Sequence, residues 1–376
     1  MGNHLGENIP KLGFGFMRLP KLEDGSYDMD QVIDMVDLFM ESGFTYFDTA
    51  YVYDGGKSEE ALRSALVERY PRDAYTVATK VNARVASTAE EAQSQLSVSL
   101  ERLGLEYVDF YLLHAVMDDV IDTYDGYGLW EFVRAEREAG RIRHMGFSFH
   151  GTPALLERLL TEHPEVEFVQ LQLNYADWEN PTVASRACYE IARSHGVPVV
   201  VMEPVKGGAL ATPPAPVAEV LAAADPDASA ASWAIRYAAS LEGIMTVLSG
   251  MSTLAQVEDN VSYMRDFKSL DEGERAVVER AREALAGIRQ VPCTACRYCV
   301  EGCPQCIPIP DIFAARNQEL IWGRADKAKA AYLEAVGAKG AGRASDCIQC
   351  GQCEAACPQN LPIIELLEEC AEAYEG

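Results

Sequence analysis

The chain has 376 residues, 48% of them hydrophobic, and a formal net charge of −26 at pH 7. That length suits one large domain with an appendage rather than a single small domain. Nucleic acids and anionic membrane surfaces are bound through clustered Lys and Arg, so the acidic balance argues against both as partners. The N-terminus has no basic segment followed by an apolar core, and no apolar stretch approaches the ~20 residues of a membrane helix. We therefore expect a cytoplasmic protein.

Short apolar runs alternate with amphipathic stretches over about the first 270 residues, which is typical of repeated strand–helix units. The expected strands are residues 12–16, 45–47, 75–79, 108–113, 144–147, 168–173, 197–202 and 245–248. The expected helices are residues 30–42, 58–69, 88–103, 129–139, 153–160, 181–194, 228–239 and 253–267. Eight such units predict a closed (β/α)8 TIM barrel. An open doubly wound sheet is the alternative, but no G-x-G-x-x-G fingerprint follows the first strand.

Two further segments are defined by their composition. Residues 211–227, rich in Pro and Ala, are interpreted as an exposed loop inserted after the seventh strand. A charged helix near residues 271–287 is expected to link the barrel to a region rich in cysteine.

Eight of the eleven cysteines fall in two short runs, which is unusual for a cytosolic protein unless they bind something. Each run has the spacing C-x2-C-x2-C-x3-C-P, which is typical of 4Fe-4S ferredoxins. In two-cluster ferredoxins the fourth cysteine of each run ligates the other cluster. We therefore assign one cluster to Cys293, Cys296, Cys299 and Cys357, and the other to Cys347, Cys350, Cys353 and Cys303.

Other uses of these cysteines fit the pattern less well. Disulfides are disfavoured in a reducing compartment, and zinc sites pair two C-x2-C units without a third cysteine two residues on. Cys306 is an additional thiol that we interpret as a small packing residue, with a role as an alternative cluster ligand as the other interpretation. Between the runs, residues 312–317 and 325–336 are expected to be helical. The predicted organisation is a barrel over residues 1–270, a linker helix over 271–290 and a small α-helical, ferredoxin-like iron–sulfur domain over 291–376.

Four polar residues stand at or just beyond the C-terminal ends of three successive expected strands. They are Asp48, Tyr53, Lys80 and His114. In a (β/α)8 barrel these strand ends share one face, where catalytic groups assemble. Such a group can donate a proton to a carbonyl as a hydride arrives. Tyr53 would be the acid and Lys80 the cation that activates it, with Asp48 orienting the lysine. His114 would hydrogen-bond the substrate oxygen.

Each of these residues also has a simpler interpretation. A lysine at a strand end can be a structural ion-pair partner, and a histidine can be a hydrogen-bonded core residue. A tyrosine beyond a strand can be part of the barrel rim. Their occurrence together favours a catalytic group.

Longer motifs surround these residues. The stretches GFGFMRLP, FDTAYVYDGGKSEEALRSAL, ATKV, DFYLLH, GFSFHG, FVQLQLNY, VMEPVKGGAL and SGMSTLAQVEDN occur in this order between about Leu12 and Asn260. On these motifs the sequence resembles the aldo/keto reductases. The resemblance implies an (α/β)8 barrel that interconverts carbonyls and alcohols with a nicotinamide coenzyme. It places the catalytic tetrad on the four residues above and the carboxamide contacts on Ser148 and Gln172. The added cysteine runs resemble a branch of that family with a C-terminal ferredoxin domain.

Several positions depart from the family pattern. Phe149 stands where the family has Asn, and Met202 stands where an aromatic side chain stacks on the nicotinamide. Gly250 and Gln256 occupy positions where NADPH-using members carry Lys and Arg. A 2′-phosphate would be poorly neutralised there, so NADH or another phosphate-bearing cofactor is an alternative to NADPH.

A phosphate site is expected in the loops after the seventh and eighth strands. Glycines there allow close backbone approach, and the helix that begins near residue 253 presents free N–H groups to an anion. The candidate contacts are Lys206, Gly207, Gly208, Ser249, Gly250, Ser252, Gln256 and Asn260.

Two functions from different classes fit these features. The first is an oxidoreductase acting on a small carbonyl or alcohol with NAD(P)H, whose clusters exchange electrons with a redox partner or with a bound cofactor. The second is an electron-transfer module whose barrel binds a flavin or docks a redox partner. A nicotinamide moves two electrons and a cluster moves one, so a flavin is the usual intermediary between them. The four polar residues at the strand ends favour the first function.

Overall fold

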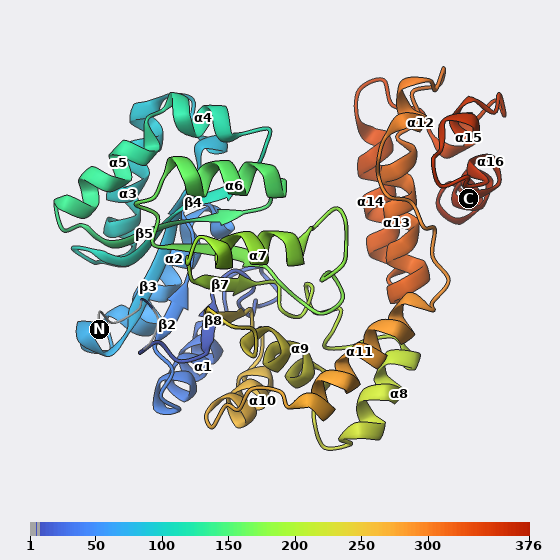
Figure 1. Cartoon of the computed structure of the whole chain (residues 1–376). Coiled ribbons are helices and arrows are strands. Elements are labelled where there is room, and N and C mark those ends of the chain that lie inside the picture. The colour runs from blue at the N-terminus through green and yellow to red at the C-terminus, as the bar shows by residue number, and fades with distance from the viewer. Residues whose placement is uncertain (1–4, 6–7) are drawn as a thin grey trace. The chain divides into compact units, whose positions relative to one another are not determined.

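The computed structural model describes residue 5 and residues 8–376 (Figure 1). Eight parallel strands pair in sequence order, and the eighth pairs with the first, which closes the barrel. The strands are β1 (Leu12–Gly15), β2 (Tyr46–Asp48), β3 (Thr76–Val81), β4 (Val108–Val116), β5 (Ile142–Phe149), β6 (Phe168–Gln172), β7 (Val199–Met202) and β8 (Ile244–Ser249). The predicted TIM barrel is confirmed.

Helices connect the successive strands. They are α1 (Met29–Glu41), α2 (Lys57–Leu62), α3 (Ala89–Leu103), α4 (Ile121–Gly126), α5 (Leu129–Glu138), α6 (Pro153–Glu162), α7 (Ser185–Ser194), α9 (Ala230–Ala239) and α10 (Leu254–Met264). Four of them begin at a Ser or Thr whose hydroxyl accepts a backbone N–H of the first turn, which satisfies a donor that has no partner inside the helix. These N-caps are Thr88, Thr152, Ser229 and Thr253.

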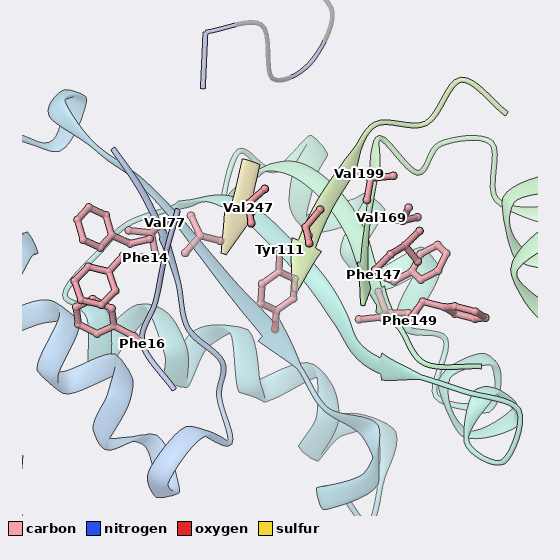
Figure 2. Close-up of a cluster of buried hydrophobic side chains, with 14 of the residues drawn as sticks. Phe14, Phe16, Val77, Tyr111, Phe147, Phe149, Val169, Val199 and Val247 are labelled. Atoms are coloured by element: carbon pink, nitrogen blue, oxygen red, sulfur yellow. The ribbon is translucent and has the colours of Figure 1, made fainter. Parts of the chain in front are cut away.

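The strands bury both of their faces. Side chains such as Phe14, Val77, Tyr111 and Phe147 belong to the large core between the barrel and its helices (Figure 2). The alternate residues fill the barrel itself as a second cluster: Tyr46, Ala78, Phe110, Leu112, Phe168, Val200, Met245 and Leu248. Because side chains along a strand point alternately to its two faces, this second cluster fixes which residues face the interior of the barrel.

The chain divides into two compact units. One comprises the described part of Met1–Ala211 together with Pro226–Val278, and the other comprises Thr212–Asp225 and Glu279–Gly376. The helix α11 (Glu272–Ala286) runs across the boundary between them. The prediction of a loop over residues 211–227 is wrong for its middle part, where the structure has the helix α8 (Ala215–Ala224). Its prolines stand at the helix start, where a missing N–H costs nothing, and alanines and Leu221 continue the helix.

In its described residues, the regular secondary structure of the second unit is all helical, and the cysteine runs lie largely in the loops between the helices. After α8 and the end of α11 it contains α12 (Tyr298–Glu301), α13 (Ile309–Trp322), α14 (Ala325–Gly337), α15 (Gln352–Ala356) and α16 (Ile363–Tyr374). Its own core includes Ile309, Phe313, Ile363 and Leu367. The two helices expected between the cysteine runs are present, although α13 is longer at both ends than predicted. In the described part of the chain, no helix has the length and apolarity that a membrane crossing requires.

Candidate functional site

Strand alternation brings three of the four predicted catalytic residues to the same end of the barrel. Asp48 lies two residues beyond Tyr46, Lys80 two beyond Ala78 and His114 two beyond Leu112, and the earlier residue of each pair faces the interior. All three therefore continue the inward-facing rows at the C-terminal ends of β2, β3 and β4.

Lys80 and Asp48 form a buried ion pair. The Lys80 Nζ donates to Asp48 Oδ1 and to the carbonyl oxygen of Thr49, both at 2.6 Å. The two residues are 1% and 3% exposed, so neither charge is solvated by bulk water. Burial lowers the pKa of Lys80, but the charges of Asp48 and Tyr53 outweigh burial and hold that pKa above its usual value. The lysine is therefore a permanent cation at neutral pH.

Tyr53 begins a short 3-10 turn, Tyr53–Gly56, that follows β2. The Nζ of Lys80 lies 5.1 Å from the centre of its ring, and the ring of His114 lies 5.6 Å away, edge to face. Burial raises the pKa of the Tyr53 hydroxyl, while the charge of Lys80 acts in the opposite direction. The hydroxyl is therefore protonated at neutral pH and available as a proton donor.

His114 is neutral at the same pH. Burial, with the nearby charges of Lys80 and His150, lowers its pKa to about 3. Its buried Nδ1 has no hydrogen-bond partner among the described residues, whereas its carbonyl oxygen accepts from the Tyr124 hydroxyl. Buried polar atoms are normally paired, so an orphan nitrogen at the barrel mouth suits a group that meets a ligand.

Ser148, at the end of β5, has a structural partner on the neighbouring strand. Its hydroxyl oxygen accepts the N–H of Ala115 at 2.7 Å. Ala115 has a positive φ of 51° and lies where the register between β4 and β5 shifts, between Leu113 and Val116. The contact thus stabilises the irregular backbone directly after His114, and the hydroxyl hydrogen of Ser148 remains able to donate.

Gln172 and Lys206 meet at a buried aspartate that the sequence analysis did not identify. Asp177 accepts from Gln172 Nε2 at 3.1 Å, from Asn174 Nδ2 at 2.9 Å and from Lys206 Nζ at 2.5 Å. Asp177 is 1% exposed, so Lys206 compensates a buried carboxylate. The expected phosphate cation is therefore already paired. The spacing in Asn174-x-x-Asp177, with the Asp177 N–H donating to the Asn174 side chain, is the signal that could have revealed this turn.

The predicted contacts after β8 form two local groups. Asn260 on α10 donates to the Ser249 hydroxyl at 2.6 Å, which ties the end of β8 to that helix. Gln256 accepts the Ser252 N–H at 2.7 Å, next to the N-cap Thr253. Gly207 and Gly208 have positive φ values, 59° and 83°, which glycine adopts without strain.

Arg18, on the loop after β1, is a second residue that the sequence analysis missed. Its side chain packs over Gly250, its carbonyl oxygen accepts from the Ser252 hydroxyl at 2.6 Å, and its guanidinium lies near Gly207. A partly exposed ion pair at 3.4 Å joins it to Glu203. The structure thus places an arginine between the two loops proposed for phosphate. Only the closure of β1 against β8 brings it there, so no local pattern could have revealed it.

The cysteines of the second unit line two cavities. The first, with an empty volume of ≈ 320 Å³ including open space, is lined by Cys293, Cys296, Cys299 and Cys357. The second, of ≈ 310 Å³, is lined by Cys347, Cys350, Cys353 and Cys303. Each cavity thus combines three cysteines of one run with the fourth of the other run.

The remaining walls of these cavities are mainly apolar. Phe313 and Ile363 line the first, Ile307 and Leu367 line the second, and Ile309 lines both. Among the described residues, no three Cys, His, Asp or Glu side chains are placed to hold a single metal ion. Four thiols that line one cavity, with a hydrophobic surround, fit a 4Fe-4S cluster.

Three other cysteines lie outside the runs. Cys188 and Cys370 are buried. Cys306 is exposed, so its interpretation as a packing residue is wrong. Its backbone has a positive φ of 52° in the turn after Cys303.

Comparisons with known proteins identify the family of each part of the chain. The model of the aldo/keto reductase family matches residues 11–283, and that of the 4Fe-4S dicluster domain matches residues 292–361. An L-galactose dehydrogenase of Arabidopsis thaliana is 28% identical over 289 residues, which are 72% of this chain and 88% of that protein. An aldo-keto reductase of Bacillus halodurans, in its holo form, has a TM-score of 0.61 at 24% identity, over 75% of this chain and 96% of that chain.

A second solved structure is an aldo-keto reductase from Klebsiella pneumoniae in complex with NADPH. Its TM-score is 0.59 at 20% identity, over 72% of this chain and 90% of that chain. Both structures share the barrel fold with this chain. The family match covers well over half of the chain, and the dicluster match covers both cysteine runs. The chain therefore belongs to the aldo/keto reductase family, carries a C-terminal 4Fe-4S dicluster domain and is an oxidoreductase.

Proposed function

We propose that the barrel interconverts a small carbonyl compound and its alcohol with a nicotinamide coenzyme. The observation that carries this proposal is the buried ion pair of Lys80 and Asp48 beneath the ring of Tyr53. A buried pair is costly to desolvate and is weak evidence of stabilisation alone. This pair lies at the C-terminal end of the barrel, next to a tyrosine and an unpaired histidine nitrogen. That position suits a role in proton transfer better than a role in stabilising the fold.

In the reductive direction, a bound reduced nicotinamide would supply a hydride to the carbonyl carbon. The C=O double bond becomes a single bond, and its oxygen takes the proton of the Tyr53 hydroxyl. Lys80 stabilises the phenolate that forms, and Asp48 holds Lys80 in place. His114, being neutral, can hydrogen-bond the substrate oxygen without competing as an acid. The alcohol and the oxidised coenzyme are the products.

Ser148 and Gln172 are proposed to hold the carboxamide of the coenzyme. The Ser148 oxygen already accepts from Ala115, which leaves its O–H to donate to the carboxamide oxygen. The Gln172 nitrogen donates to Asp177, which leaves its side-chain oxygen to accept from the carboxamide NH2. The Klebsiella pneumoniae structure, which is a complex with NADPH, supports a nicotinamide coenzyme here.

Arg18 is proposed to bind a phosphate of the coenzyme. Lys206 is held at 2.5 Å by the buried carboxylate of Asp177, whereas the ion pair of Arg18 with Glu203 is longer, at 3.4 Å, and partly exposed. We expect Arg18→Ala to raise the KM for the coenzyme about tenfold, the loss of one charge-assisted hydrogen bond of ~1.4 kcal/mol, with little change in kcat. Steady-state kinetics at varied coenzyme measures this. Arg158→Ala, which removes a similarly exposed arginine on α6, is the control. Equal KM values for Arg18→Ala and the unaltered protein would exclude Arg18 from the coenzyme site.

The dependence of turnover on pH tests the assignment of the acid. Carbonyl reduction requires Tyr53 to be protonated, and burial raises its pKa. The pKa of His114 is about 3, so this residue does not titrate in the pH range of the assay. We therefore expect kcat for reduction to be flat between about pH 5 and 9 and to fall only in alkali, while alcohol oxidation rises with pH. Rate profiles in both directions at saturating coenzyme measure this. A reductive kcat that falls with a midpoint near the usual histidine value, about 6.5, would contradict it.

The two clusters are proposed to exchange single electrons with a redox protein. One cysteine of each cavity, Cys296 and Cys350, is exposed, so each cavity reaches the surface of the second unit. Hydride transfer at the tetrad is complete without the clusters, since the coenzyme supplies both electrons.

A further inference from the structure

The two cysteine runs are copies of one backbone motif. Cys347 follows Cys293 by 54 residues, and the same interval relates the remaining members of the runs. Three pairs of non-helical residues at this interval share a positive φ: Ala295 and Gln349, Arg297 and Gly351, Cys306 and Asn360. Backbone hydrogen bonds repeat as well. The Cys303 N–H donates to the carbonyl oxygen of Val300, and the Cys357 N–H donates to the backbone carbonyl oxygen of Glu354. The two cavities are therefore matched environments within a single chain.

Solvent exposure is matched between the copies too. Cys299 and Cys353, the third cysteines, are each 7% exposed. Cys296 and Cys350, the second cysteines, are both exposed. The potential of an iron–sulfur cluster depends on cluster type, charge, hydrogen bonds to sulfur and solvent exposure. The ligands and their exposure agree between the two copies, whereas the charge that lines the two cavities differs.

Arg297 provides such a difference. It lines the first cavity, and Gly351 occupies the equivalent position in the second run. The residues that line the second cavity include no charged side chain. Arg297 also adopts a φ of 64°, a left-handed conformation that an arginine adopts only with strain and that glycine adopts freely. The first run thus keeps a strained cation where the second run has the unstrained residue.

A salt bridge fixes the guanidinium of Arg297. Its Nη1 and Nη2 donate to the two carboxylate oxygens of Asp311, at 3.2 and 3.0 Å. Asp311 lies in the first turn of α13, beside the first run. The carboxylate offsets part of the positive charge, and the arginine remains the charged group that lines the cavity.

We infer that Arg297 makes the cluster of Cys293, Cys296, Cys299 and Cys357 the more easily reduced of the two. An added electron makes a cluster more negative, and a cation beside it stabilises that reduced state. An electron that enters the second unit is then held mainly by the first-cavity cluster. Electron transfer between the two clusters is therefore favourable toward that cluster. This inference rests on the dicluster domain and not on the barrel chemistry, so either can fail without the other.

Anaerobic redox titration of the full chain with both clusters, followed by electron paramagnetic resonance, tests the inference. The unaltered protein is expected to be reduced in two separate steps. The step at higher potential is assigned to the first-cavity cluster. Arg297→Gln should lower the potential of this upper step and so reduce the difference between the two potentials. Asp311→Asn, which frees the arginine from its carboxylate, should move the upper step higher. Gly351→Arg should raise the lower step, and a Cβ there would meet no atom within 4 Å.

Matched variants separate local charge from other effects. Arg289→Gln removes the same charge from an arginine of the second unit that lines neither cavity, and should leave both steps in place. Arg297→Gly relieves the backbone strain and should shift the upper step as far as Arg297→Gln does. Iron content confirms that each variant holds both clusters. The inference is overturned if Arg297→Gln moves neither step or moves the lower one, or if Arg289→Gln produces the same shift.

Discussion

Replacing Tyr53 with phenylalanine is expected to abolish carbonyl turnover while the clusters remain reducible by dithionite. The substitution removes only the hydroxyl that would donate the proton, so the loss in kcat should be about 10²–10⁴-fold, the usual contribution of a general acid. The ring and its position near Lys80 and His114 are retained, which keeps the fold and the coenzyme site intact. Coenzyme oxidation with a panel of small aldehydes and ketones measures the effect.

Tyr51→Phe is the control for this substitution. Tyr51 is a neighbouring tyrosine whose ring packs 4.6 Å from the guanidinium carbon of Arg102, and its backbone N–H donates to the carbonyl oxygen of Lys80. Loss of its hydroxyl should leave turnover unchanged. Full carbonyl turnover in Tyr53→Phe would show that Tyr53 is not the acid.

Removing the fourth cysteine of one run is expected to destroy the cluster of the other run. Cys357→Ala should lose about half of the iron, and the surviving cluster should be the one in the cavity of Cys347, Cys350 and Cys353. Cys303→Ala should lose the other half. Iron analysis and electron paramagnetic resonance of anaerobically purified protein measure both outcomes.

Double variants determine which cysteines share a cluster, because substitutions that act on one site are not additive. Cys357→Ala with Cys293→Ala should lose no more iron than either alone, whereas Cys357→Ala with Cys347→Ala should lose nearly all of it. Cys306→Ala, an exposed cysteine that lines neither cavity, is the control and should keep both clusters. If Cys357→Ala with Cys293→Ala instead lost nearly all of the iron, and Cys357→Ala with Cys347→Ala lost only half, each run would supply all four ligands of its own cluster.

Features set by local spacing could be predicted from the sequence. The order of strands and helices follows from hydrophobic periodicity, and the two-residue alternation along β2, β3 and β4 is sufficient to bring Asp48, Lys80 and His114 together. The cavities are likewise lined by the cysteines that the spacing of the runs indicates.

Features set by long-range pairing could not be predicted in this way. Lys206 carries no local sign that it is neutralised by Asp177, 29 residues earlier in the chain. Arg18 reaches the loops after β7 and β8 only because β1 closes the barrel against β8. In both cases the deciding contact depends on the folded chain.

The α8 helix is a local feature that the sequence could have revealed. Prolines usually mark loops, but at the first helical positions they are compatible with a helix.

The most direct test of the proposed function is an anaerobic titration of the cluster-loaded protein with NADH and NADPH, with and without a small carbonyl. Absorbance follows the nicotinamide, electron paramagnetic resonance follows the clusters, and flavin is measured by its fluorescence after release from the protein. We predict that reduced coenzyme binds without a flavin and is consumed in equal amount with the carbonyl, and that Tyr53→Phe binds coenzyme but consumes none. If neither coenzyme binds, or if a tightly bound flavin accounts for all electron transfer and no carbonyl is reduced, the barrel is a flavin or docking module and not a carbonyl reductase.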